Sequence, residues 1–379
     1  MKLTASSGFS NVLLAILFLL NISLVSGQQA APPKQPLAED VFKNIKALRG
    51  ITASEFMETM GFFSASLGAN CNYCHVGESG GDWSKYADDS VPQKRTARGM
   101  VAMVATMNKQ FFGGRRVLTC YSCHRGADHP KVIPNLDELY ADPSQEPTDA
   151  FLEQEPKKIS ADQVLDKYLQ ALGGVQKLNA ITSYVGKGTY GGYDTPKVPF
   201  DIYAKAPNQR AAIVHTPNGD SSNVFDGRNA WVAAPATDRP ITLLTLEGKA
   251  LDAAKVDGDM LFPARIKQMF TEWKVGFPYI LNDRDTLVLE GSGGGRGPVR
   301  FYFDKETGLL TRLVRYVDTV VGLSPTRYDF SDYREIAGVK MPYKWNVTWL
   351  DGRGSVELTD LQVNVPVDAS KFAKPATPK

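Results

Sequence analysis

Cysteine and histidine are both scarce in this sequence, and each occurs four times in 379 residues. An excess of charge of one sign is also lacking, because 43 Lys and Arg stand against 41 Asp and Glu and leave a net charge of +2. This balance argues against a nucleic-acid partner, since a phosphate backbone is held by a strong basic excess. Four cysteines are also too few for a disulfide scaffold in a chain of this length.

Long apolar runs are lacking except near the N-terminus, where residues 11–20 are almost all apolar and the small residues Val25-Ser26-Gly27 follow. Such a run is typical of a cleaved signal peptide, which we predict over residues 1–27. The alternative is an uncleaved membrane anchor, but the run is shorter than the roughly 20 residues that span a bilayer. We therefore expect a periplasmic protein, which is membrane-associated if the anchor is retained.

All four cysteines lie in two motifs of the same form, Cys71-Asn72-Tyr73-Cys74-His75 and Cys120-Tyr121-Ser122-Cys123-His124. C-x-x-C-H is the attachment motif of c-type haem. Its two thiols reach the two vinyl groups on one porphyrin edge, and the imidazole of the next residue lies under the iron. We predict two haems bound covalently by Cys71, Cys74, Cys120 and Cys123, with His75 and His124 as proximal iron ligands.

Two other uses of these cysteines are possible in principle. Four thiolates can form a tetrahedral zinc site, and each pair can form a local disulfide. Both leave the adjacent histidines without a role, although histidine is scarce and occurs twice at the same offset. Haem attachment is therefore the preferred interpretation.

Apolar periodicity predicts helices at residues 41–50, 52–68 and 92–113, the last two of which end at glycine shortly before a C-x-x-C-H motif. The helix at 52–68 carries Met60 on its apolar face, and we predict Met60 as the sixth ligand of the first haem. The helix at 92–113 carries Met100, Met103 and Met107 on one face, and periodicity does not choose among them for the second haem.

The remaining histidines support methionine ligation. Only His129 and His215 lie outside the motifs, and they are expected to be a surface residue and a strand residue. Methionine is therefore favoured as the sixth ligand of at least one haem. Five arginines around the second motif either pair with haem propionates or form a solvated basic face: Arg95, Arg98, Arg115, Arg116 and Arg125.

An acidic, proline-bearing stretch at residues 141–159 is predicted to be a linker. We assign residues 28–38 to a leader, 39–140 to a dihaem cytochrome c domain and 160–379 to a second domain. A capping box at Ser160 begins a helix that stops at Gly173-Gly174. Residues 141–159 therefore separate two predicted domains.

Beyond residue 182, short alternating runs between turn signals predict a mostly antiparallel sheet. The expected strands are residues 299–303, 309–316, 327–333, 344–350 and 355–365. The expected turns are residues 218–219, 226–227, 304–308, 337–338 and 351–352. A helical insertion near residues 264–273 is expected to cover one sheet face. The predicted fold class is α+β, with an N-terminal all-α c-type dihaem domain followed by a mostly antiparallel, curved β-sheet domain.

Residues 41–126 resemble the photosynthetic reaction centre cytochrome c subunit family, in which each haem segment is a methionine-bearing helix, a turn and C-x-x-C-H. The resemblance rests on Thr96-Ala97-Arg98-Gly99-Met100-Val101-Ala102-Met103 and on Thr119-Cys120-Tyr121-Ser122-Cys123-His124-Arg125-Gly126. It implies Met100, the first methionine after the Ala-Arg pair, as the second sixth ligand, and it supports Met60. The best-known member has four haems and usually a lipid-bearing N-terminal cysteine, whereas this chain has two motifs and no such cysteine.

Residues 160–366 resemble, more weakly, the curved antiparallel sheet of periplasmic lipoprotein-carrier proteins. That resemblance implies an apolar concavity and a lipophilic ligand.

The preferred hypothesis is a periplasmic dihaem electron carrier that is not an enzyme and exchanges single electrons with a redox partner protein, such as a membrane-bound electron-transfer complex. His/Met ligation fills both axial positions of the iron and raises its reduction potential, as a carrier requires. One alternative is a dihaem peroxidase-like enzyme with an open iron position. Another is a haem-tethered module that binds a lipophilic molecule.

Overall fold

The computed structural model describes residues 35–77, 83–130, 132–133, 159–192 and 196–378. The predicted signal peptide and, apart from Ile159, the predicted linker fall outside these residues. The helices are α1 (Ala38–Val41), α2 (Ala53–Leu67), η1 (Cys71–Tyr73), η2 (Trp83–Ala87), α3 (Pro92–Phe111), α4 (Cys120–His124), α6 (Ala161–Ala171), α7 (Val175–Asn179), α8 (Gly248–Asp259), η3 (Pro263–Gln268) and η4 (Ala369–Phe372). The strands are β1 (Ser183–Gly192), β2 (Val198–Lys205), β3 (Gln209–Thr216), β4 (Gly219–Phe225), β5 (Ala230–Ala233), β6 (Leu243–Leu246), β7 (Glu272–Val275), β8 (Tyr279–Leu281), β9 (Arg284–Gly293), β10 (Arg296–Asp304), β11 (Leu310–Thr319), β12 (Gly322–Ile336), β13 (Val339–Trp349) and β14 (Gly352–Val363).

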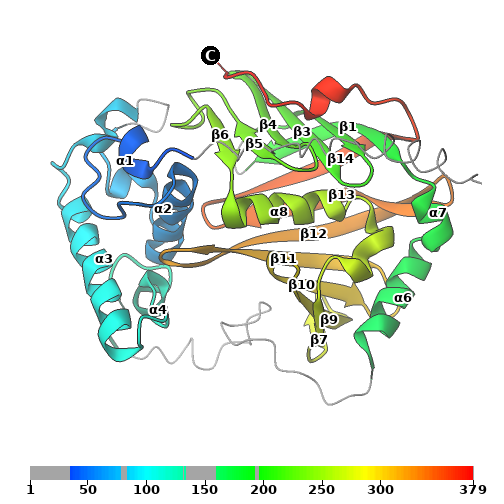
Figure 1. Ribbon diagram of the computed structural model, residues 1–379, viewed down its shortest axis with the longest axis horizontal. Coiled ribbons are helices and arrows are strands. Elements are labelled where there is room, and N and C mark those ends of the chain that lie inside the picture. Colours follow the sequence, from blue (N-terminus) through cyan, green and yellow to red (C-terminus); the bar gives the residue numbers. More distant parts are fainter. Residues whose placement is uncertain (1–34, 78–82, 131, 134–158, 193–195, 379) are drawn as a thin grey trace, which may run out of the picture. The chain divides into compact units, whose positions relative to one another are not determined.

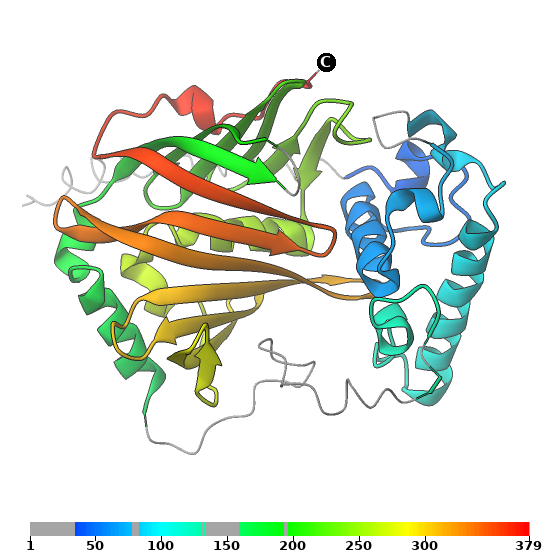
Figure 2. The same cartoon turned by 180° about the vertical axis from the view of Figure 1, so that it is seen from behind.

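The strands form one antiparallel sheet of 14 strands, in the order β6-β5-β4-β3-β2-β1-β14-β13-β12-β11-β10-β9-β7, with β8 paired to β9. The sheet is curved, and α8 lies across one of its faces (Figure 1). Figure 2 shows the strands from the opposite side. The predicted α+β class, with a helical region followed by an antiparallel sheet, is confirmed.

The five predicted turns all connect neighbouring strands. In four of them a residue with positive φ makes the turn, namely Gly219, Gly227, Gly308 and the Ala337-Gly338 pair. Ala337 and Gly338, for example, have φ of 49° and 76° and join β12 to β13. The five predicted strands correspond to β10 through β14, which pair with one another in chain order.

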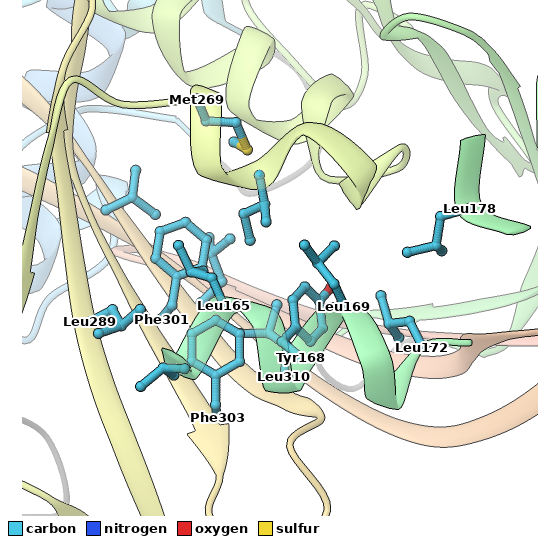
Figure 3. Packing of buried hydrophobic residues seen from close by; sticks show 14 of the residues in the cluster. Leu165, Tyr168, Leu169, Leu172, Leu178, Met269, Leu289, Phe301, Phe303 and Leu310 are labelled. Atoms are coloured by element: carbon cyan, nitrogen blue, oxygen red, sulfur yellow. The ribbon is translucent and has the colours of Figure 1, made fainter. Parts of the chain in front are cut away.

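The main apolar core lies between α6 and the sheet. The Ser160 hydroxyl accepts a hydrogen bond from the Gln163 N–H at 3.2 Å, and the Gln163 side chain accepts one from the Ser160 N–H at 2.8 Å. This capping box begins α6 where the sequence predicted it. The helix then packs Leu165, Tyr168 and Leu169 against Phe303 and its neighbours (Figure 3).

Two helices were predicted at the wrong positions. The helix predicted at 41–50 is only α1, because Phe42 is extended and Asn44 and Leu48 have φ of 62° and 61°. The insertion predicted at 264–273 is the short helix η3 followed by β7. The longer helix of this region is α8, which begins at Gly248, 16 residues before the predicted start. No helix among the described residues has the length and apolar character of a membrane span.

Gly68 ends α2 in the left-handed conformation, with φ of 60°, and a Cβ at this position would collide with the Gly126 carbonyl oxygen. Gly113, two residues after the end of α3, has nearly the same φ of 61°, but a Cβ at this position would meet no atom within 4 Å. We expect Gly113→Ala to lower the free energy of unfolding by about 1–2 kcal/mol through backbone strain alone. Gly68→Ala adds a steric cost of about 1–3 kcal/mol.

Chemical denaturation followed by circular dichroism measures both losses. Equal losses for the two variants would contradict the tight approach of Gly68 to Gly126.

Candidate haem-attachment site

The first motif begins at Cys71, four residues after the end of α2 at Leu67. Cys71 opens the single turn η1, and the N–H of His75 donates to the Cys71 carbonyl oxygen at 3.0 Å. Nδ1 of His75 lies 2.9 Å from the Tyr86 carbonyl oxygen, and the His75 ring stacks on the Tyr86 ring at a centroid distance of 4.7 Å. Because a carbonyl only accepts, Nδ1 carries the proton and Nε2 keeps its lone pair.

Burial lowers the pKa of His75 below its ordinary value. The hydrogen bond to Tyr86 opposes this shift, and the positive charges of Lys94 and Arg98 add to it. The ring is therefore neutral at pH 7, which is the form that ligates a metal.

The second motif repeats the arrangement on a separate element. Thr119 and Ser122 form a capping box that starts α4, with the Thr119 N–H donating to the Ser122 hydroxyl at 3.0 Å. Nδ1 of His124 lies 3.0 Å from the Ala127 carbonyl oxygen. His124 thus also holds its proton on Nδ1 and presents Nε2 as an acceptor.

Asn108 of α3 fixes the turn that leads into the second motif, and sequence reasoning missed it. Its side-chain oxygen accepts from the Val117 and Leu118 N–H groups at 3.1 and 2.9 Å, and its amide donates to the Leu118 carbonyl oxygen at 2.7 Å. Asn108 is the one buried residue of α3. No sequence signal distinguished Asn108 from the other polar residues of the helix predicted at 92–113.

All four cysteines are free thiols, so the two local disulfides are not formed. Across the described residues, no group of three or more His, Cys, Asp or Glu side chains comes together as a metal site would require, so the four cysteines are not gathered at one zinc centre. Burial raises the pKa of Cys71, Cys74 and Cys120 above the ordinary thiol value.

The structure brings the two motifs together at the end of α2 (Figures 1 and 2). The Gly126 N–H donates to the Ser66 carbonyl oxygen at 2.9 Å. Tyr73, inside the first motif, donates to Asp128, four residues after the second, at 3.3 Å. Motifs separated by about fifty residues in the sequence are therefore neighbours in the fold.

The methionine-bearing face of α3 is open. Met100, Met103 and Met107 expose 41%, 46% and 36% of their surface, and Phe111 exposes 73%. The prediction that these residues share one face of the helix is confirmed. No part of the described chain covers that face.

On α2, Met60 is half-buried, and the buried residues of this helix are Ala53, Ser54, Thr59, Gly61, Phe62 and Ser66. Over the described parts of residues 35–133, only three apolar side chains are buried: Ala38, Ala53 and Phe62. The helical region therefore has very little apolar core of its own.

Two of the five arginines near the second motif are held by carboxylates. Arg98 pairs with Asp89 at 2.9 Å, and Arg116 pairs with Asp318 of β11. Hydrogen bonds from Arg98 and Lys46 hold the pKa of Asp89 far below its usual range. Arg95, Arg115 and Arg125 have no carboxylate partner among the described residues and remain candidates for an anionic group.

The two other histidines lie where they were predicted. His129 is on the surface, and His215 is in β3. Nδ1 of His215 lies 2.7 Å from Asp220, and Nε2 lies 3.3 Å from Asp201. Partial burial lowers the pKa of His215, but the two carboxylates outweigh this effect and raise it above the ordinary value.

The sheet region contains an apolar cavity with a volume of about 120 Å³. Aromatic and aliphatic side chains from α6, α7 and the strands line most of it, among them Tyr168, Leu178, Tyr328, Phe330 and Trp345. Three charged residues also line it: Arg210, Asp257 and Lys340. The sequence did not indicate these charges, because they come from three separate elements.

Comparison with known proteins agrees with the motifs of the helical region. The photosynthetic reaction center cytochrome c subunit of Rubrivivax gelatinosus is 35% identical over 102 residues, which are 26% of this chain and 26% of that protein. The corresponding subunit of Thermochromatium tepidum is 33% identical over 111 residues, 28% of this chain and 26% of that protein. The similarity thus spans about a quarter of the length of these relatives.

Among solved structures, a LolA superfamily protein from Nitrosomonas europaea covers 57% of this chain and 98% of its own, at 14% sequence identity and a TM-score of 0.39. This likeness concerns the fold alone. The resemblance expected from residues 41–126 is confirmed and extends further, because residues 17–163 match the family described as photosynthetic reaction centre cytochrome C subunit.

Proposed function

We propose that the helical region binds two c-type haems and that the protein is a periplasmic electron carrier rather than an enzyme. Cys71 and Cys74 bind one haem covalently, and Cys120 and Cys123 bind the other. The axial pairs are His75 with Met60 and His124 with Met100. The supporting observation is the repeat itself: at two separate elements, a free thiol pair precedes an imidazole whose Nδ1 proton is held by a backbone carbonyl.

The open faces of α2 and α3 fit two large apolar groups. Helices of a soluble region normally bury their apolar stripe. Here the stripe of α3 is at least one-third exposed at Met100, Met103 and Met107. A thioether that is accessible on such a face is also a suitable soft ligand for haem iron.

Bound haem would supply reversible one-electron chemistry through its iron. The protein's own residues fix the orientation of each imidazole, since the Tyr86 and Ala127 carbonyl oxygens accept from Nδ1 at 2.9 and 3.0 Å. The contacts of Gly126 with Ser66 and of Tyr73 with Asp128 hold the two motifs next to each other. Such adjacency favours electron transfer within one chain.

We further propose that residues 39–140 and 160–379 are separate domains joined by residues 141–159. The redox partner is a protein, and the family resemblance favours a membrane-bound electron-transfer complex, as in photosynthesis. The apolar cavity of the sheet region supports a second role for that domain, the binding of a lipophilic ligand.

Carbon monoxide and peroxide distinguish a carrier from a peroxidase. The reduced full-length protein is expected to bind little carbon monoxide, to exchange electrons rapidly with small redox partners and to turn over peroxide negligibly, because both axial positions are filled. Optical spectroscopy and stopped-flow kinetics measure these properties. Strong carbon monoxide binding together with peroxide turnover of roughly 1–1000 per second would establish the enzyme instead.

A further inference from the structure

We propose that the cavity of the sheet domain selects a single-chain amphiphile with an anionic head, and that Arg210 binds that head. This inference deepens the lipophilic-ligand role proposed above and rests on it.

The buried acid of the cavity is already neutralised. Arg315 donates to both oxygens of Asp257, at 2.9 and 3.2 Å, and the Tyr328 hydroxyl donates to Asp257 Oδ2 at 3.0 Å. Arg315 also lies over the Tyr328 ring, 5.9 Å from its centroid. Both oxygens of Asp257 therefore accept hydrogen bonds, and the charge of Asp257 is matched by Arg315.

Arg210 of β3 is an additional cation on the same cavity wall. Its guanidinium donates to the Asn223 side-chain oxygen at 3.3 Å, and within the described part of the chain it makes no other side-chain hydrogen bond and no ion pair. A guanidinium has five N–H donors, so most of its donors are unused.

Two tyrosine hydroxyls show that Arg210 is close to the apolar lining. Burial raises the pKa of Tyr184 and Tyr328 well above the ordinary phenol value, and the charge of Arg210 opposes this rise at both residues. Both tyrosines line the cavity with Arg210. The exposed Lys340 adds a second positive charge to the lining.

The cavity thus combines apolar walls with an excess of positive charge. An anionic head would form charge-assisted hydrogen bonds with Arg210, whereas a cationic head would be repelled and a neutral head would gain less. An apolar cavity of about 150 Å³ holds one benzene molecule. The volume of about 120 Å³ is somewhat smaller, so the cavity holds part of an alkyl chain and not the whole of a long one.

Octyl compounds that differ only in the head group test this inference on the full chain by titration calorimetry. The probes are octanoate, octanol and octyltrimethylammonium, and acetate supplies the anion without the chain. We expect octanoate to bind most tightly and acetate not to bind measurably. Arg210→Gln is expected to weaken octanoate binding by roughly 10- to 100-fold and to leave octanol binding unchanged.

The matched control is Arg228→Gln, which removes an exposed arginine on the turn after β4 and is expected to leave all affinities unchanged. Retained octanol binding by Arg210→Gln shows that the variant is folded. Equal binding of the three octyl compounds, unaffected by Arg210→Gln, would overturn the anion preference but keep the lipophilic site. Binding of acetate alone would show a simple anion site and overturn the amphiphile. Failure of every octyl compound to bind would overturn both the inference and the proposed lipophilic role.

Discussion

Loss of one of two covalent haems is the expected result of replacing Cys120 and Cys123 together by serine. The intact mature protein should carry two haem additions, and the double variant should carry one. The reason is that each thiol pair serves one porphyrin, and serine oxygen does not form the thioether bond. Mass spectrometry of the denatured protein measures the number directly.

Ser122→Ala is the matched control, because Ser122 lies inside the same motif and supports the Thr119 cap but contributes no thiol. It should retain two haems. A wild-type mass equal to the bare polypeptide, or to a polypeptide with two disulfides, would refute haem attachment.

A large decrease in the reduction potential of one haem is expected for Met100→Leu, and of the other haem for Met60→Leu. Leucine keeps the size and apolar character of the side chain but offers no ligating atom. Axial ligands tune haem potentials over about 0.8 V, and methionine lies toward the high end of that range. The sulfur-to-iron absorption of the affected haem should also disappear in the oxidised protein.

Met103→Leu and Met107→Leu are the controls, since both residues share the open face of α3 with Met100. They should leave potentials and absorption unchanged. If Met100→Leu left the spectrum intact and either control abolished it, the register implied by the family resemblance would be wrong.

Local sequence signals predicted the elements that begin and end through local contacts. The cap at Ser160 and the left-handed Gly68 involve residues within a few positions of each other. The hairpin turns are local in the same sense, because the turn residues themselves, such as Ala337-Gly338, adopt the positive φ that the turn needs. Such features need no knowledge of the rest of the chain.

Tertiary contacts decided the elements that were predicted wrongly. Phe42 leaves the helix to pack on Phe56, with ring centroids 4.9 Å apart, and Lys46 reaches Asp89 at 2.7 Å. The helix α8 was missed because it buries mainly small residues, such as Ala253 and Gly258, and has no strong apolar stripe. Gly258 allows the close approach of this helix to the backbone at Asn208.

The candidate site also combines features that the local sequence predicts with features that depend on tertiary contacts. The thiols and imidazoles were predictable from C-x-x-C-H, because the motif contains them. Their supports were not, since the Tyr86 and Ala127 carbonyl groups are backbone atoms that every residue possesses. Arg210 and Arg315 likewise acquire their different roles only when β3, α8 and β11 meet around the cavity.

The open methionine face of α3 also bears on how the protein is made. This face carries an exposed apolar stripe formed by Met100, Met103, Met107 and Phe111. Exposed apolar patches of this kind promote association and aggregation. Under the haem binding proposed above, a chain that lacked its haems would leave this stripe exposed and would be prone to aggregate. Attachment of the haems would then cover the stripe and stabilise the helical region as well as confer redox activity.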